Sequence, residues 1–232
     1  MSIKFISKTI MLAACLFTVT EASAQRHDFA NYQRYAKENA ELGQPKKGEK
    51  RVVFMGNSIT EGWVNHHPDF FKNNGYIGRG ISGQTSYQFL LRFRQDVIDL
   101  KPRIVVINYG TNDIAENTGK YDEDQTYGNV VSMVEMARAN KIKVILTSCL
   151  PAGEFPWRPE IRDAMQKVRH LNARVEAYAK QKKIPYVDYF SAMISADGTR
   201  MNTAYTPEHI HPNSAGYDVM ESLIQPVIKK MR

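Results

Sequence analysis

Three short segments of this 232-residue chain hold groups that could take part in acyl transfer. Ser58 lies in Gly56–Gly62 (GNSITEG), directly after an apolar run, and is a possible nucleophile. Gly83 in GISGQTS could offer an unobstructed backbone N–H, and Asn112 in GTND could donate its side-chain amide to an oxyanion. Each residue also has an ordinary explanation, as an N-cap serine, a turn glycine or an Asx-turn asparagine.

A fourth segment, with sequence TPEHIHPNSAGY, places Glu208 three residues before His211 and just ahead of a predicted helix. On one tight turn this spacing lets the carboxylate reach one imidazole nitrogen while the other nitrogen faces outward. Such a carboxylate fixes the tautomer and stabilises the imidazolium, as in a catalytic triad. A lone histidine would more often be structural, but the four segments together supply nucleophile, base and oxyanion donors.

The elements that must position these residues alternate along the chain. Continuous apolar runs predict strands at Arg51–Gly56, Arg103–Asn108 and Lys143–Ser148, with weaker patterns at Tyr76–Gly80 and Ile184–Asp188, and amphipathic helices at Gln84–Leu100 and Ser214–Met231. Five strands are too few for an eight-stranded barrel. We therefore predict an α/β fold, a three-layer α/β/α sandwich around a five-stranded parallel sheet. The active sites of such sheets lie beyond the carboxyl ends of the strands.

Competing motifs are absent at the first predicted strand. Neither a G-x-x-x-x-G-K-[ST] phosphate loop nor a G-x-G-x-x-G dinucleotide motif follows it. The G-x-S-x-G elbow of α/β-hydrolases is missing too, because Gly56-Asn57-Ser58-Ile59-Thr60 ends in threonine. The basic residues are spread along the chain without interleaved aromatics, so we predict no nucleic-acid partner.

These segments together resemble the SGNH hydrolase superfamily, the GDSL esterases and lipases. The four family blocks match GNSIT, GISGQTS, GTND and EHIHPN, in family order from Gly56 to Asn213. The resemblance implies a flavodoxin-like fold with Ser58 as nucleophile and His211 as general base. It also implies an oxyanion hole from the backbone N–H groups of Ser58 and Gly83 and the side chain of Asn112. It implies no cofactor.

Two positions depart from the family pattern. The residue before the serine is usually aspartate and is Asn57 here, which removes a charge near the nucleophile. The block that usually reads D-x-x-H has Glu208, which is one methylene longer and chemically equivalent, so we predict Glu208 as the triad acid. Asp113 is the alternative carboxylate, although in this family it more often supports the loops around the site.

The segment Gly75–Gly119 most resembles the bacterial acetylhydrolase-like branch, whose members often remove acetyl groups from carbohydrates. We therefore predict hydrolysis of short-chain esters of small molecules or glycans. Trp63 and Trp157 could stack on a sugar ring or could instead pack their loops against the domain. The alternatives are a lysophospholipase or thioesterase, and a carbohydrate-binding protein without catalytic activity. The adjacent His66 and His67 show no further ligand at metal spacing, so we interpret them as a surface loop and predict no metal site.

The N-terminus has the pattern of an export signal. An apolar run of about 11 residues, Thr9–Val19, follows two lysines, and Ala22-Ser23-Ala24 supplies the small residues of a cleavage site. We predict a signal peptide over 1–24 and a single hydrolase domain over 25–232, either periplasmic or extracellular and without stable membrane insertion. A rival interpretation is lipidation at Cys15, in Leu12-Ala13-Ala14-Cys15.

Cleavage after Ala24 would remove two basic residues and one acidic residue, which lowers the formal charge from +7 to +6. It would also leave Cys149 as the one remaining cysteine, which cannot form an intramolecular disulfide. The sequence leaves the oligomeric state open.

Overall fold

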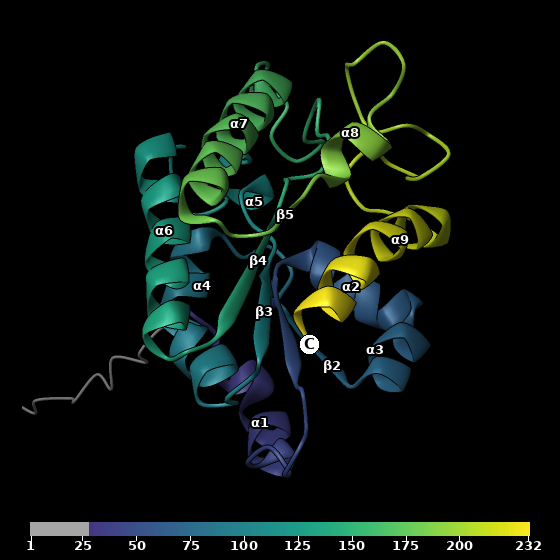
Figure 1. The fold of residues 1–232 in the computed structure, drawn as a ribbon. Helices are drawn as coiled ribbons and strands as arrows, with labels where there is room; N and C mark the ends of the chain where they lie inside the picture. The colour runs from purple at the N-terminus through teal and green to yellow at the C-terminus, as the bar shows by residue number, and fades with distance from the viewer. Residues whose placement is uncertain (1–27) are drawn as a thin grey trace, which may run out of the picture.

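Five parallel strands form the centre of the fold in the computed structural model, which describes residues 28–232 (Figure 1). They are β1 (Val52–Gly56), β2 (Tyr76–Gly80), β3 (Ile104–Ile107), β4 (Lys143–Thr147) and β5 (Tyr186–Val187). Their order in the sheet is β2-β1-β3-β4-β5, and every pairing is parallel. The predicted sheet is confirmed, with β5 shorter than the sequence pattern indicates.

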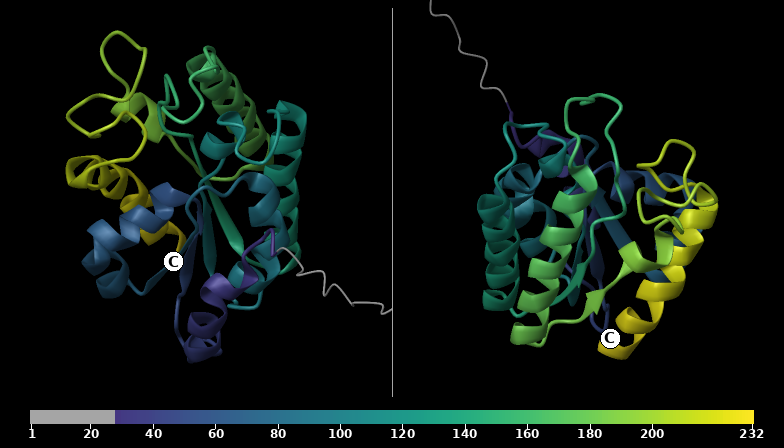
Figure 2. Two further views of the ribbon diagram at one scale, coloured as in Figure 1. Left: turned by 180° about the vertical axis from the view of Figure 1, so that it is seen from behind. Right: turned by 90° about the horizontal axis from the view of Figure 1, so that it is seen from above.

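Helices cover both faces of the sheet, which confirms the three-layer α/β/α architecture. They are η1 (Tyr32–Tyr35), α1 (Ala36–Leu42), α2 (Ser58–His66), α3 (Pro68–Asn74), α4 (Ser86–Phe93), η2 (Arg94–Ile98), α5 (Thr111–Ile114), α6 (Glu123–Ala139), α7 (Ala164–Lys182), α8 (Tyr189–Met193) and α9 (Ser214–Met231). Helices α4, α6 and α7 lie on one face and α2, α3 and α9 on the other (Figures 1 and 2). The predicted helix over Gln84–Leu100 is α4 continued by the π-helical turn η2.

The strands are apolar throughout because both of their faces are buried. In β1, Val53 and Met55 pack into the core beneath α4, α6 and α7, whereas Val52 and Phe54 pack into the core beneath α2 and α9. Successive side chains of a strand point to opposite faces of the sheet, so a strand covered on both sides must be apolar at every position. This is the pattern that makes the central strands visible in the sequence.

The predicted signal peptide and Cys15 lie outside the described residues. Over residues 28–232, no helix is both long and apolar enough to cross a membrane. Cys149 is a free, fully buried thiol whose Sγ lies 2.8 Å from the carbonyl oxygen of Tyr109. Burial holds the pKa of this thiol well above its usual value, so Cys149 is a core residue.

Candidate active site

Ser58 is the first residue of α2, and a tight passage from β1 into this helix places it there. Asn57 caps the helix, since its Oδ1 accepts the N–H of Ile59 at 3.0 Å, and it is buried. Gly80 at the end of β2 allows the close approach, because a Cβ there would lie 2.3 Å from the backbone nitrogen of Glu61. The cap requires only an acceptor oxygen, which asparagine and aspartate share.

His211 lies between Ser58 and Glu208. Its Nε2 is 2.8 Å from Ser58 Oγ, and its Nδ1 is 2.5 Å from Glu208 Oε1. The carboxylate can only accept, so Nδ1 carries the proton and Nε2 is free to accept the Ser58 hydroxyl proton. Glu208 Oε1 also accepts the backbone N–H of His211 at 2.7 Å, which fixes the turn that joins the two residues. The three side chains have the order and geometry of a catalytic triad.

The alternative carboxylate, Asp113, has another position and another role. It is buried, and it accepts the backbone N–H of Ser86 at 3.1 Å and the hydroxyl of Ser86 at 2.5 Å. Burial raises the pKa of Asp113, and the hydrogen bonds from Ser86 oppose that shift. Asp113 therefore fixes the start of α4, and the carboxylate that contacts the histidine is Glu208.

Gly83 and Asn112 belong to two loops that are joined by hydrogen bonds. Gly83 has a φ of +77°, a left-handed conformation that favours glycine, and a Cβ there would meet open space. One side-chain N–H of Asn112 donates to the carbonyl of Gln84 at 2.9 Å, which leaves its second N–H for a ligand. The carbonyl of Gly83 accepts from Asn117 at 3.0 Å. The carbonyls of Gly83 and of the next residue, Gln84, are therefore both held by asparagine side chains.

Sequence reasoning missed Glu61, one helical turn after Ser58. Its Oε2 accepts both the N–H of Ser82, at 2.9 Å, and the Ser82 hydroxyl, at 2.5 Å. Arg34, from the N-terminal segment, donates to Oε1 of the same carboxylate at 3.1 Å. Partial burial tends to raise the pKa of Glu61, but the hydrogen bonds from Ser82 and Arg34 outweigh it, and the net shift is downward. The sequence gives no signal for contacts between residues so far apart.

Arg92 is a second missed residue, and it holds three strand and loop ends together. Its guanidinium is fully buried and donates to the carbonyls of Gly56 and Arg79, both at 2.9 Å, and to Oε1 of Gln84 at 2.6 Å. Asp96, one turn further along, accepts from the same group at 2.9 Å and balances its charge. The ends of β1 and β2 and the Gly83 loop therefore share one buried anchor.

The interpretation of Trp63 as a substrate contact is wrong. Its side chain is buried, with 2% exposed, and it stacks between Phe70 and Tyr217 at ring distances of 5.5 and 5.8 Å. Its Nε1 donates to Glu221 of α9 at 2.9 Å. Trp63 therefore packs α2 against α9, and no sugar ring can reach its face.

Trp157 lies in the loop after β4 and is 44% exposed. Its Nε1 donates to Asn117 Oδ1 at 3.0 Å, and the amide of the same Asn117 donates to the carbonyl of Gly83. The buried ring of Phe155 lies 5.5 Å from the Trp157 ring and supports it from within the loop. A single asparagine thus links an exposed aromatic ring to the Gly83 turn.

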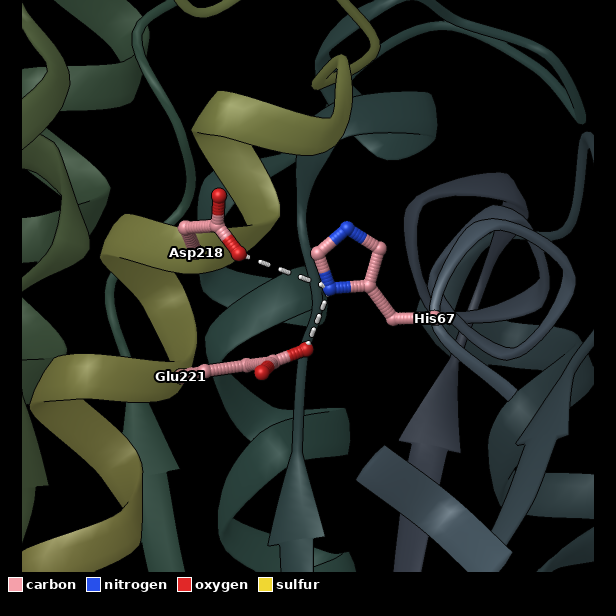
Figure 3. Close-up of side chains that lie close together, drawn as sticks. All are labelled: His67, Asp218 and Glu221. Atoms are coloured by element: carbon pink, nitrogen blue, oxygen red, sulfur yellow. Dashed lines mark hydrogen bonds and ion pairs between the residues drawn. The ribbon is translucent and has the colours of Figure 1, made fainter. Parts of the chain in front are cut away.

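The interpretation of His66 and His67 as a surface loop is correct only in part, since His66 is exposed but helical and His67 is the non-helical residue that joins α2 to α3. His66 is the last residue of α2, and its Nδ1 lies 2.8 Å from the carbonyl oxygen of Gly62. His67 is 15% exposed and packs against α9, with Nδ1 at 2.7 Å from Glu221 and 3.8 Å from Asp218 (Figure 3). The two carboxylates lie about 150 residues further along the chain, so no local spacing could reveal them.

Comparison with known proteins agrees with this geometry. The model of the GDSL-like lipase/acylhydrolase family matches residues 54–219, which include every residue of the triad arrangement. The chain belongs to this family. A GDSL-like lipase from Bacteroides thetaiotaomicron is 67% identical, with a TM-score of 0.87 over 88% of this chain and all of that one. GDSL family members are ester hydrolases, and the protein is a carboxylic ester hydrolase.

Two more distant relatives are a lipoprotein and an esterase. The uncharacterized lipoprotein YqeF of Bacillus subtilis (strain 168) is 28% identical over 66% of this chain and 75% of that protein. An acetylxylan esterase of Xylanibacter ruminicola is 23% identical over 80% of this chain. The match spans 44% of that longer esterase.

Proposed function

We propose that this hydrolase removes acetyl and other short acyl groups from esterified carbohydrates, outside the cytoplasm, through an acyl-enzyme on Ser58. The observation that carries the proposal is the pair of contacts made by His211, 2.8 Å to Ser58 Oγ and 2.5 Å to Glu208 Oε1. Serine, imidazole and carboxylate in this order form a nucleophile, a general base and the group that orients the base.

In the first step, Ser58 Oγ attacks the ester carbonyl while Nε2 of His211 takes the hydroxyl proton. Glu208 stabilises the imidazolium that forms. The tetrahedral intermediate then collapses, the C–O bond to the alcohol breaks, and His211 returns its proton to the leaving oxygen. In the second step His211 takes a proton from water, the hydroxide attacks the acyl-enzyme, and the proton returns to Ser58 as acetate leaves.

The negative charge of each tetrahedral intermediate is bound by the backbone N–H groups of Ser58 and Gly83 and by the free side-chain N–H of Asn112. Donors fixed before the reaction stabilise such a charge without reorganising, and each is worth about 3–4 kcal/mol in acyl transfer. The hydrogen bonds that hold Ser82, the Gly83 carbonyl and Asn112 supply this rigidity. Each of these steps uses only side chains, backbone groups and water.

The substrate class rests on two observations. One relative is an acetylxylan esterase, an enzyme that acts on an acetylated polysaccharide. In this chain, Trp157 presents an exposed ring that is linked through Asn117 to the Gly83 turn. An aromatic face in this position suits the apolar face of a sugar ring whose acetyl group enters the site.

Export is proposed from the signal pattern over residues 1–24 and from the lipoprotein among the relatives. The mass of the mature protein tests it. A chain that starts at Gln25 supports cleavage after Ala24. A mature chain that starts at a diacylated Cys15 would contradict cleavage after Ala24 and would indicate export with a lipid anchor. An uncleaved chain would contradict export by either route.

Acetate release from a panel of acetylated glycans tests the activity directly. Ser58→Ala should abolish release while the circular dichroism spectrum and thermal unfolding stay unchanged, and a fluorophosphonate probe should label wild type at Ser58. Activity of the Ser58→Ala variant within a few-fold of wild type would overturn the mechanism. Failure of the probe to label wild type would favour a carbohydrate-binding protein without catalysis. A series of p-nitrophenyl esters with its maximum at C8 or longer would favour a lysophospholipase or thioesterase.

A further inference from the structure

We propose that His67, Asp218 and Glu221 form a zinc site that joins the end of α2 to α9. In the part of the chain that the structure describes, one group of histidine, cysteine and carboxylate side chains brings three ligand atoms within 4.8 Å of one another, and it is this group. The two carboxylates project from successive turns of α9 toward the same nitrogen of the imidazole (Figure 3).

The distances suit a small tetrahedral cation. Zinc binds nitrogen and carboxylate oxygen at about 2.0–2.2 Å, so two ligand atoms on one tetrahedral zinc lie about 3.3–3.5 Å apart. Here Nδ1 of His67 lies 2.7 Å from Glu221 Oε1 and 3.8 Å from Asp218 Oδ1. Shifts of well under 1 Å would make both distances fit, and water would complete the coordination.

The positions of the three side chains suit a metal site, because they converge on one point and two of them are largely buried. Asp218 and Glu221 are three residues apart on one helix, so their side chains lie on the same face. His67 and Glu221 are 15% and 21% exposed, which keeps their side chains in place. Asp218 is 71% exposed and leaves an open path by which an ion can enter.

The chemistry of the three ligands selects the metal. An imidazole nitrogen with two carboxylates suits zinc and its neighbours in the first transition row, whereas calcium and magnesium prefer oxygen ligands. The ion would balance the two negative charges of Asp218 and Glu221. Trp63 Nε1 donates to Glu221 Oε1 at 2.9 Å, the kind of surrounding hydrogen bond that orients a metal-binding carboxylate.

The site would join the helix that begins at Ser58 to the helix that follows His211. Helix α2 begins at Ser58, and α9 begins three residues after His211. At 1.5 Å per residue, α2 puts about 13 Å of helix between Ser58 and His67. The proposed site therefore lies apart from the triad, and the expected effect of the ion is to raise thermal stability and to leave the chemical step unchanged.

The test is a titration of the purified, metal-stripped protein with ZnCl₂, followed by isothermal calorimetry and thermal unfolding. We expect one zinc per chain with micromolar or tighter affinity, a rise in Tm of several degrees at saturation, and no comparable rise with MgCl₂. Asp218→Asn and His67→Asn should each weaken zinc binding at least tenfold. Asp218 is exposed, so its variant tests the site without disturbing the core.

His170→Asn is the matched control, because His170 also pairs with a glutamate at 2.7 Å, but outside the three-ligand group. It should leave zinc binding unchanged. Ester hydrolysis by Asp218→Asn should equal that of wild type, so the outcome is independent of the proposed activity. Unchanged zinc affinity in both Asp218→Asn and His67→Asn, or the absence of one-to-one binding by wild type, would overturn the proposal.

Discussion

Glu61 holds Ser82 by two hydrogen bonds to one carboxylate oxygen, from the backbone N–H at 2.9 Å and from the hydroxyl at 2.5 Å. Ser82 immediately precedes Gly83, whose N–H is a proposed oxyanion donor. Gly83 itself has no side chain to fix its orientation, and its left-handed φ of +77° is one that few other residues adopt, so contacts of its own carbonyl and of its neighbours must hold it. The direction of that N–H thus depends on its neighbours, and Glu61 is the charged group that fixes one of them.

We therefore predict that Glu61→Ala lowers kcat about 10- to 100-fold with little change in KM. Complete loss of an oxyanion donor costs about 100- to 1,000-fold, and a loosened donor should cost less. Glu61→Gln, which keeps one acceptor oxygen, should fall between this variant and wild type. Glu38→Ala is the control, because Glu38 is the other carboxylate near Arg34, at 3.7 Å, and is exposed. An effect on KM alone would assign Glu61 to substrate binding.

Glu61 also predicts how the free energy of unfolding depends on pH. Its pKa is lowered in the folded protein, so its contribution is complete above the ordinary carboxyl pKa of about 4.3 and is lost as the pH falls through the lower folded value. The difference in urea midpoint between wild type and Glu61→Gln should be constant from pH 6 to 8 and should shrink below about pH 4.3. A difference that grows on acidification would show that the sign of the shift is wrong.

The sequence was sufficient for the fold because burial on both faces makes the central strands apolar at every position. It also singled out Ser58 and His211, which the structure brings into contact, because both lie in segments just before or at the start of a helix. It failed for Trp63, which follows Ser58 by five residues. At about 100° per residue, that places Trp63 about 140° around α2 from Ser58, on the face that packs against α9.

The remaining failures concern contacts between distant segments. Arg34, Glu61 and Ser82 meet through the packing of an N-terminal segment, a helix and a loop. His67 meets Glu221 because α9 returns across α2. Neither set of contacts leaves a local pattern in the sequence. Hydrophobic periodicity shows which face of a helix or strand is buried, but it does not show which other element covers that face.

Asn57 is expected to act through its cap. Asn57→Ala removes the acceptor for the Ile59 N–H and should lower the free energy of unfolding by about 1 kcal/mol, measured by urea denaturation. Asn57→Asp keeps an acceptor oxygen at a helix N-terminus, where a negative charge is favourable, and should lose less. If the aspartate variant were the less stable of the two, burial of its charge would outweigh the cap.

Glu208 should be replaceable by the residue that its family usually carries. Glu208→Gln can turn an N–H toward His211 and favour the wrong tautomer, so we predict a fall in kcat of about 100- to 1,000-fold. This is less than the 10,000-fold known for a buried triad carboxylate, because Glu208 is 40% exposed and water can take part. Glu208→Asp should retain at least tenfold more activity than Glu208→Gln. Equal activity of Glu208→Gln and wild type would remove Glu208 from the triad.

Trp157 provides the sharpest test of the carbohydrate substrate. The ring is exposed and held by Asn117, so its removal should leave the triad intact and weaken only the binding of a sugar. We predict that Trp157→Ala raises KM for acetylated xylo-oligosaccharides several-fold, in line with about 0.5–1.5 kcal/mol for an aromatic contact, and leaves p-nitrophenyl acetate hydrolysis within twofold.

Trp157→Phe separates stacking from positioning, because phenylalanine keeps a flat ring but cannot donate to Asn117. If stacking dominates, this variant should retain most of the oligosaccharide affinity. If the bond to Asn117 matters for the Gly83 turn, Trp157→Phe and Trp157→Ala should lose kcat on both substrates, because a misdirected oxyanion donor affects every ester. An equal rise in KM for p-nitrophenyl acetate and for the oligosaccharide would show that the ring contacts the acyl group and not the sugar.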